Sequence, residues 1–259
     1  MDTLLVAREG GIATITLNRP EKKNALNLAS WSELLGVLQE VADRPEDRAV
    51  VITGADGNFC SGADLSDPGM ATGGERPFMQ YMRHLADPLL RLHRLPKPTI
   101  AKVDGVAVGI GLSLALGCDL VVASDRARFS EIFPRRGLTV DGGSSWLLPR
   151  LVGLHKAKEL AMLGEIIPAS EAAAIGLINK VVPLAELDKA VDDWAGRLAH
   201  GPTLALSLTK RLLDNSFATS FDQALEDEAR SQHVTFSTHD VREAMGAFAE
   251  KREPSFKGF

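Results

Sequence analysis

Two short runs of β-prone residues open the chain, at residues 4–7 and 12–17, and Glu9-Gly10-Gly11 connects them. A short glycine-containing connection between two such runs predicts a β-hairpin. Residues 49–53 form a continuous apolar run that ends at Gly54, as expected of a strand buried on both faces. The pattern therefore indicates a hairpin followed by a strand of a parallel sheet.

Apolar residues at steps of three and four predict a helix over residues 28–41, where they are Leu28, Trp31, Leu34, Leu35 and Leu38. The order of strand, turn and helix then recurs, with a helix predicted at 78–95, a strand at 99–103, a helical segment from about Gly109 and a strand at 119–123. This alternation is typical of an α/β core.

The pattern changes beyond Gly176. After one apolar run at 178–182, it predicts four helices, at residues 184–198, 203–213, 221–236 and 240–251. Their apolar stripes must pack on a surface, either the protein's own sheet or another subunit. Residues 67–76 contain three glycines and two acidic residues without periodicity, so we expect a surface loop there.

Composition narrows the class of protein. The chain has 259 residues, 45% of them hydrophobic, with a net charge of −5, and no basic tract suggests a nucleic-acid partner. No apolar run approaches the roughly 18 residues of a membrane span, and residues 1–10 lack the basic start and long apolar core of a secretory signal. Two cysteines and six scattered histidines show no metal-ligand spacing. We expect a globular cytoplasmic protein without a metal.

Two glycine-rich turns follow predicted strands, at residues 58–64 and 104–111. Glycine allows the backbone to approach a ligand closely, and the second turn also opens a helix, whose free N–H groups favour an anion. Each turn could thus donate one N–H to an oxyanion. The alternative is that the glycines only form tight turns.

Asp141 precedes Gly142-Gly143-Ser144-Ser145 and the helical run 146–148, which is the place of a helix N-cap. A functional carboxylate at this position would need an apolar setting that shifts its pKa, and Phe133 and Trp146 could supply one. Both interpretations of Asp141 stay open at this stage.

Ser113 lies in Gly111-Leu112-Ser113-Leu114-Ala115, which imitates a G-x-S-x-G nucleophile elbow. A hydrolase triad of Ser113, Asp141 and His155 or His200 is conceivable. The predicted helix from Gly109 places Ser113 inside the helix, however, which favours a serine that merely faces a pocket. Leu114 also stands where the third glycine of a dinucleotide motif would be.

Several of these stretches, in this order, resemble the enoyl-CoA hydratase/isomerase (crotonase) family. The matching residues are 15–20 and 24–26, 51–54 through 59–64, 98–105 through 109–111, 118–119, 127–129, 142–143, 148–150, 174–177, 247–254, Phe256 and Gly258. The ordered set is specific and covers essentially the whole chain.

The resemblance implies a spiral of β-β-α units at residues 1–200, a helical trimerisation region at 201–259, and trimers that often pair into hexamers. The substrate would be a coenzyme A thioester, with no separate cofactor. The oxyanion hole would be formed by the backbone N–H groups of Ala63 and Ile110. Residues implied to bind the substrate are Ala25, Leu26, Ser61, Gly62, Asp64, Leu65, Gly109, Ser113, Phe133, Phe256 and Lys257, the last from a neighbouring subunit.

Departures from the family pattern concern proton transfer. Hydratases of this family use two glutamates, and the matching positions here are Ser113 and Phe133, which cannot act as carboxylates. Glu131, two residues before Phe133, is a different location.

The position of Asp141, by contrast, resembles that of the catalytic aspartate in double-bond isomerases and in an aromatic acyl-CoA dehalogenase. We therefore expect an enoyl-CoA isomerase that uses Asp141. The alternatives are an enoyl-CoA hydratase, a non-catalytic acyl-CoA-binding or assembly protein, and a thioester hydrolase that uses Ser113.

Overall fold

The larger of two β-sheets contains most of the strands that the apolar runs predict. The computed structural model describes residues 3–67 and 78–259. The sheet has the strand order β1-β2-β3-β4-β6-β9, with β1 at Leu4–Glu9, β2 at Ile12–Leu17, β3 at Ala49–Gly54, β4 at Thr99–Val103, β6 at Leu120–Ser124 and β9 at Lys180–Val182. β1 and β2 pair antiparallel, and each later neighbour pairs parallel. The predicted hairpin and parallel sheet are confirmed.

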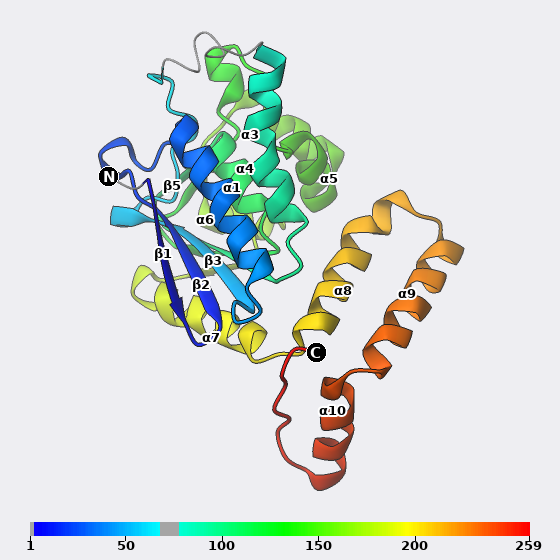
Figure 1. The fold of residues 1–259 in the computed structure, drawn as a ribbon. Coiled ribbons are helices and arrows are strands. Elements are labelled where there is room, and N and C mark those ends of the chain that lie inside the picture. The colour runs from blue at the N-terminus through cyan, green and yellow to red at the C-terminus, as the bar shows by residue number, and fades with distance from the viewer. Residues whose placement is uncertain (1–2, 68–77) are drawn as a thin grey trace.

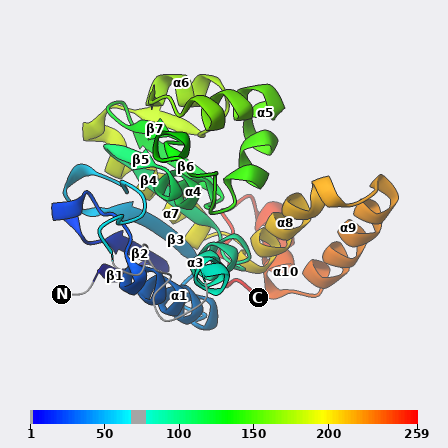
Figure 2. The same ribbon diagram turned by 90° about the horizontal axis from the view of Figure 1, so that it is seen from above.

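Helices cover both faces of this sheet (Figures 1 and 2). α1 (Leu28–Asp43) and α3 (Phe78–His93) pack together on one side, and α7 (Leu187–Ala199) contacts β2, β3, β4 and β6 on the other. Side chains of β3 are consequently buried at four successive positions, 49–52. This double coverage explains the continuous apolar run, since both faces of the strand meet apolar side chains.

The second sheet is small and was not predicted. It has the order β5-β7-β8, with β5 at Val106–Val108, β7 at Arg128–Ser130 and β8 at Ile167–Pro168. Strands of two or three residues are too short to show a period in the sequence. Helix α4 (Ile110–Leu116) follows β5 directly, and α5 (Ser144–Leu163) and α6 (Ala169–Ala174) complete the core.

The last helices, α8 (Thr203–Asn215), α9 (Phe221–Phe236) and α10 (His239–Glu250), extend away from the sheets (Figures 1 and 2). The chain end returns to the amino end of β3, where Arg48 Nη1 donates to the carbonyl of Phe256 at 3.1 Å. Large apolar side chains on and between these helices are exposed, among them Phe217, Phe221, Phe236 and Phe248. The four C-terminal helices are confirmed, and within residues 3–67 and 78–259 no surface covers these exposed apolar side chains.

Two further predictions concern a surface loop and the absence of membrane-spanning segments. The predicted loop at 67–76 lies, except for Asp67, outside the described residues. Among the residues that the structure describes, no helix is long and apolar enough to cross a bilayer.

Candidate active site

The two glycine-rich turns lie side by side because backbone hydrogen bonds join them. The Cys60 N–H donates to the Val106 carbonyl at 2.8 Å, and the Val108 N–H donates to the Cys60 carbonyl at 3.1 Å. Ala63 and Ile110, which follow these paired segments, are thereby brought to the same edge of the core.

A glycine with positive φ precedes each predicted oxyanion donor. Gly62 has φ +101° and Gly109 has φ +55°, conformations that residues with a Cβ rarely adopt. Gly62 and Gly109 turn the N–H groups of Ala63 and Ile110 away from the hydrogen bonds of a regular strand or helix. In the described part of the chain, neither the Ala63 N–H nor the Ile110 N–H has a hydrogen-bond partner. Two free donors beside each other are suited to bind a negatively charged oxygen.

Asp141 does not cap α5, so the N-cap interpretation is wrong. The cap residue is Gly143, in the left-handed region at φ +90°, and no side chain bonds to the free N–H groups there. The two glycines at 142 and 143 separate the Asp141 carboxylate from the helix end. Its backbone carbonyl, instead, accepts from the Ser144 N–H at 3.1 Å.

The Asp141 carboxyl group is held in a poorly solvated place. Oδ1 is buried and has no hydrogen-bond partner in the structure. Burial raises the pKa of Asp141 from its ordinary value to about 6. A carboxyl group with this pKa is able to accept and return a proton near neutral pH.

Asp141 also lies next to the glycine-rich turn at residues 104–111, which leads to the predicted oxyanion donor Ile110. A methyl group added at Gly142 would lie 2.7 Å from Ser113 Cβ and 3.1 Å from Ile110 Cγ1, so the chain immediately after Asp141 is in close contact with the start of α4. The structure thus brings the predicted acid/base residue and one predicted oxyanion donor together.

Ser113 is buried inside α4 and not on a strand-to-helix elbow. Its Oγ bonds to the Asp141 carbonyl at 3.1 Å and to Ser144 Oγ at 2.9 Å. His155 is exposed, and His200 Nδ1 lies 2.7 Å from the Gly196 carbonyl. The triad with either histidine is therefore not formed, and Ser113 positions the backbone of Asp141.

Phe133 occupies the other family glutamate position and is buried beside the oxyanion turn. Its Cζ would lie 3.9 Å from a methyl group added at Gly109. Phe133 thus provides an apolar wall there.

Glu131 is a further carboxyl group in this region, which the family pattern does not mark. Its side chain is buried, Oε1 accepts from Ser144 Oγ at 2.9 Å, and Oε2 is buried without a partner. Burial, with the nearby charge of Asp141, raises the pKa of Glu131 to about 7, although the Ser144 hydrogen bond opposes the shift. The sequence does contain a signal for the burial of Glu131. Ala127 and Phe129, both fully buried, stand two residues apart, and Glu131 continues this spacing on the same face.

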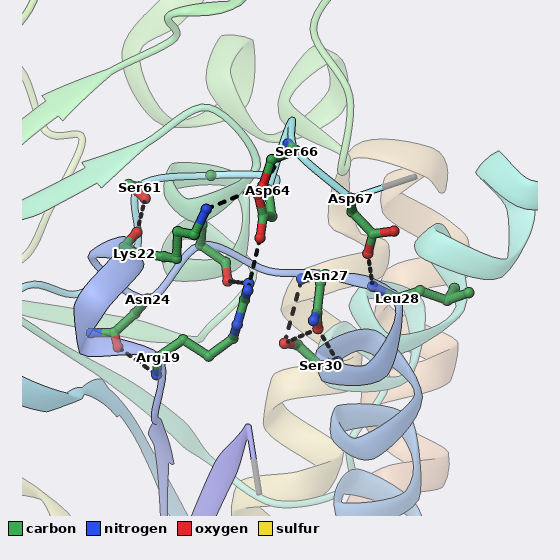
Figure 3. Close-up of polar contacts among 12 residues, drawn as sticks. Arg19, Lys22, Asn24, Asn27, Leu28, Ser30, Ser61, Asp64, Ser66 and Asp67 are labelled. Carbon is green, nitrogen blue, oxygen red and sulfur yellow. Dashed lines mark hydrogen bonds and ion pairs between the residues drawn. The ribbon is translucent and has the colours of Figure 1, made fainter. Parts of the chain in front are cut away.

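Some of the residues predicted to bind coenzyme A lie close together, in two segments at residues 22–26 and 61–64 (Figure 3). Ser61 donates from its backbone to Lys23 O at 2.9 Å and from Oγ to Lys22 O at 2.8 Å. The Leu26 N–H donates to Gly62 O, and the Asp64 N–H donates to Leu26 O, both at 2.8 Å. Residues 22–26 and 61–64 are therefore held against each other.

Arg19 stabilises this neighbourhood from below (Figure 3). Its Nη2 forms a 2.8 Å ion pair with Asp64 Oδ2, and its Nη1 donates to the Ala25 carbonyl at 2.6 Å. The hydrogen bond from Ser66, together with Arg19, lowers the pKa of Asp64 to about 2. Asp64 is therefore ionised at neutral pH and paired with Arg19, whereas the side chain of Leu65 is exposed.

Phe256 and Lys257 are not near this neighbourhood within one chain. The Phe256 carbonyl is bound by Arg48, and the Lys257 N–H donates to Asp240 Oδ1 at 2.7 Å. They lie at the amino end of β3, whereas residues 61–64 follow its carboxyl end.

A cavity of about 390 Å³ lies next to the residues that follow Asp141. Gly142, Gly143, Trp146 and Leu147 form one side, and the α3 residues Leu89 and His93 contribute to the other, with the rings of His93 and Trp146 in edge contact at 5.4 Å. Its lining is predominantly apolar.

Comparison with known structures defines the class. A solved structure of an enoyl-CoA hydratase from Bacillus anthracis superimposes with a TM-score of 0.93 at 30% sequence identity, and the match covers 99% of this chain and 100% of that one. The fold is therefore the crotonase fold, as the resemblance implied.

The sequence comparisons give the family. The model for enoyl-CoA hydratase/isomerase matches residues 7–258. The 1,2-epoxyphenylacetyl-CoA isomerase of Escherichia coli is 37% identical over 100% of this chain and 99% of its own. The short-chain-enoyl-CoA hydratase of Clostridium acetobutylicum is 36% identical over 98% and 97%. The chain belongs to the enoyl-CoA hydratase/isomerase family and is an acyl-CoA enzyme of hydratase or isomerase type.

Proposed function

We propose that the protein is an enoyl-CoA double-bond isomerase in which Asp141 transfers the proton. The observation that carries this proposal is the position of Asp141, whose neighbour Gly142 lies against Ser113 and Ile110 and whose Oδ1 is buried without a hydrogen-bond partner among the described residues. Ser113 and Phe133, at the two positions that match the glutamates of hydratases, support it. One proton-transferring group is sufficient for isomerisation, because the proton removed from one carbon returns at another.

The reaction follows from these positions. The N–H groups of Ala63 and Ile110 bind the thioester oxygen, which lowers the energy of the enolate. The Asp141 carboxylate removes a proton from C2 of a 3-enoyl-CoA, the electron pair delocalises through the enolate, and protonated Asp141 returns the proton at C4. The product is the conjugated 2-enoyl-CoA, and the carboxylate is regenerated. The apolar cavity beside Gly142 accommodates the remainder of the acyl group.

Hydration of a 2-enoyl-CoA is the second candidate. The proximity of Glu131 to Asp141 favours it, because two carboxyl groups are able to orient and activate a water. The Clostridium acetobutylicum relative is named as a hydratase. Within the described residues, however, Glu131 already accepts a hydrogen bond from Ser144, and it lies deeper than Asp141.

A pair of absorbance assays decides between them. The purified protein is incubated with a 3-enoyl-CoA and, separately, with crotonyl-CoA, while the absorbance of the conjugated thioester is followed. We expect absorbance to appear with the 3-enoyl-CoA and to persist with crotonyl-CoA. Rapid loss of the crotonyl-CoA absorbance, without reaction of the 3-enoyl-CoA, would instead establish a hydratase.

Coenzyme A binding, assembly and location belong to the same proposal. The nucleotide lies near residues 24–26, pantetheine passes Ser61 and Asp64, and Lys257 with Phe256 comes from a neighbouring subunit of a trimer or hexamer. The exposed apolar side chains of α8–α10 support such an assembly. The buried, unpaired thiols of Cys60 and Cys118 support a reducing cytoplasm. A structure with bound acyl-CoA whose nucleotide is far from residues 24–26 would reject the binding mode.

A further inference from the structure

Ser144 bonds to the side chain of Glu131 and to the backbone of Asp141, two residues whose carboxyl groups each have a buried oxygen atom. Its hydroxyl donates to Glu131 Oε1 at 2.9 Å, and its backbone N–H donates to the carbonyl of Asp141 at 3.1 Å. Glu131 Oε2 and Asp141 Oδ1 are both buried and have no hydrogen-bond partner among the residues that the structure describes. Orphaned carboxylate oxygens are costly, so their presence at one place calls for a functional explanation.

No cation balances this pair in the part of the chain that the structure describes. Neither carboxyl group takes part in an ion pair there, and the basic side chains of η3 (Phe133–Arg136), Arg135 and Arg136, are exposed. At the start of α5 the hydroxyl group of Ser144 bonds to Glu131 and also contacts the hydroxyl group of Ser113 in α4. Asp141 is the titratable group whose charge acts on Glu131. Two buried carboxyl groups without a balancing cation, of which one feels the charge of the other, do not both ionise readily.

We propose that Glu131 is a positioning residue of the active site, which keeps its own proton and thereby leaves Asp141 as the ionised group that accepts the substrate proton. The inference rests on the proposed function, since it requires Asp141 as the acceptor. Glu131 acts through Asp141 and Ser144 and does not touch the substrate. No proton leaves Glu131 during turnover: the proton taken by Asp141 from one substrate carbon returns to another.

The neutral form of Glu131 has two consequences. Through Ser144 and Ser113 it holds the Asp141–Gly142 backbone against α4, the helix that carries the Ile110 N–H. Its ionisation would place a second negative charge beside Asp141, where the enolate also forms. Burial and the charge of Asp141 raise the pKa of Glu131 to about 7, so this ionisation begins just above neutral pH.

The test is the pH profile of kcat/KM in Glu131→Gln, with Glu40→Gln, an exposed glutamate of α1, as the matched control. A glutamine side chain resembles the protonated glutamate and can still bond to Ser144. We expect wild type and Glu40→Gln to lose activity about tenfold per pH unit above about pH 7, and Glu131→Gln to remain flat. Glu131→Ala, which loses the hydrogen bond, should lower kcat about tenfold or more with KM nearly unchanged.

Ser144→Ala provides a second variant, for which we expect a shift of the pH profile in a defined direction. Ser144 donates to the Glu131 carboxylate and favours its ionised form, so removing the hydroxyl should move the alkaline limb to higher pH. This shift remains measurable if the Glu131 variants fail to fold. An unchanged alkaline limb in both Glu131→Gln and Ser144→Ala would overturn the proposal.

Infrared spectroscopy gives a readout that is independent of activity. With ¹³C-carboxyl-labelled glutamate, the difference between wild type and Glu131→Gln should contain a protonated carboxyl band at pH 6 that disappears by about pH 9. In Asp141→Asn the band should disappear at lower pH, because the neighbouring charge is gone. A Glu131 that titrates near the ordinary value of glutamate would overturn the proposal.

The two proposals fail in different ways. If Asp141→Asn retains turnover of the 3-enoyl-CoA, the proposed function is wrong, whatever Glu131 does. If Asp141→Asn loses turnover while Glu131→Gln keeps the wild-type pH profile, the isomerase mechanism stands and the role of Glu131 is wrong.

Discussion

Ser113 and Ser144 are joined by a 2.9 Å contact between their hydroxyl oxygens, which ties the first turn of α4 to the first turn of α5. The two helices carry two residues of the proposed reaction, because Ile110 begins α4 and Asp141 lies just before α5. Where hydratases of the family have a glutamate, this chain has a serine that serves as a connection. Ser113 has no carboxyl group with which to transfer a proton, and its hydroxyl group contacts Ser144 and the carbonyl of Asp141 instead.

The conformation of Gly109 should be essential for turnover. In Gly109→Ala, the new Cβ meets Ile132 and Phe133 at ordinary distances of 3.5 and 3.9 Å, so the fold should persist. The positive φ is strained for alanine, however, and its relief would redirect the Ile110 N–H. We expect kcat to fall by about 10²- to 10³-fold, as for loss of one oxyanion donor. Gly196→Ala, in α7 with no neighbour within 4 Å, is the control and should leave kcat unchanged. Equal kcat in both variants would contradict the role of Ile110.

The Arg19–Asp64 ion pair should matter for binding more than for chemistry. Arg19→Met removes the partner of a buried carboxylate and the donor to Ala25 O, so the loops at 22–26 and 61–64 should lose their fixed arrangement. We expect KM for the acyl-CoA to rise about tenfold or more, with kcat changed less. Steady-state kinetics test this, with Lys158→Met, at an exposed position of α5, as control. A kcat effect larger than the KM effect would show that Arg19 acts on the reacting atoms.

The long elements and the two glycine-rich turns were predictable from the sequence, but the second sheet was not. The hairpin and β3 have clear apolar patterns, whereas β5, β7 and β8 are two or three residues long and depend on neighbours distant in sequence. Asp141 was interpreted as a possible cap because it precedes a helical run. The left-handed Gly142 and Gly143, which move the helix start to Ser144, were recognisable only as glycines. Glu131 was not predicted from the sequence, because the family pattern places its second glutamate two residues later, at Phe133. The alternation of side chains along the strand would have indicated Glu131 instead.

The stability of the protein should fall as pH rises through the range in which Glu131 ionises. Its pKa is raised from 4.5 to about 7, so between these values the folded state holds a proton that the unfolded state has released. The stabilisation is present below about pH 4.5 and is lost above about pH 7, a change of about 3 kcal/mol at 1.36 kcal/mol per unit.

Glu131→Gln lacks this titration, so the variant should gain stability relative to wild type as the pH rises from 5 to 8. Urea unfolding at one fixed protein concentration measures the difference in free energy of unfolding between the two proteins. The contribution of Asp141 cancels approximately in this difference, because both proteins contain it. A constant difference between the two proteins across this range would mean that Glu131 titrates equally in the folded and unfolded states.

Assembly should be visible as a mass of three or six times the 27.8 kDa of one chain. Exposed phenylalanines on and beside α8–α10 form more apolar surface than a stable monomer normally leaves in water. Multi-angle light scattering at micromolar concentration checks this expectation. A monomeric mass would contradict it and would remove the neighbouring subunit that Lys257 needs to reach coenzyme A.

Asp141→Asn is the most direct test of the mechanism, because the structure separates its effects on activity and on folding. Asp141 does not cap α5, and its Oδ1 is buried without a partner, so a neutral amide should fold at least as stably as the carboxylate at pH 7. As the group that removes and returns the proton, it should be required for turnover, and kcat should fall about 10²- to 10⁴-fold with acyl-CoA affinity near wild type. Asp192→Asn, an exposed aspartate of α7, controls for the change of charge and should be fully active. An Asp141→Asn protein that is folded, binds acyl-CoA and retains wild-type kcat would show that another group transfers the proton.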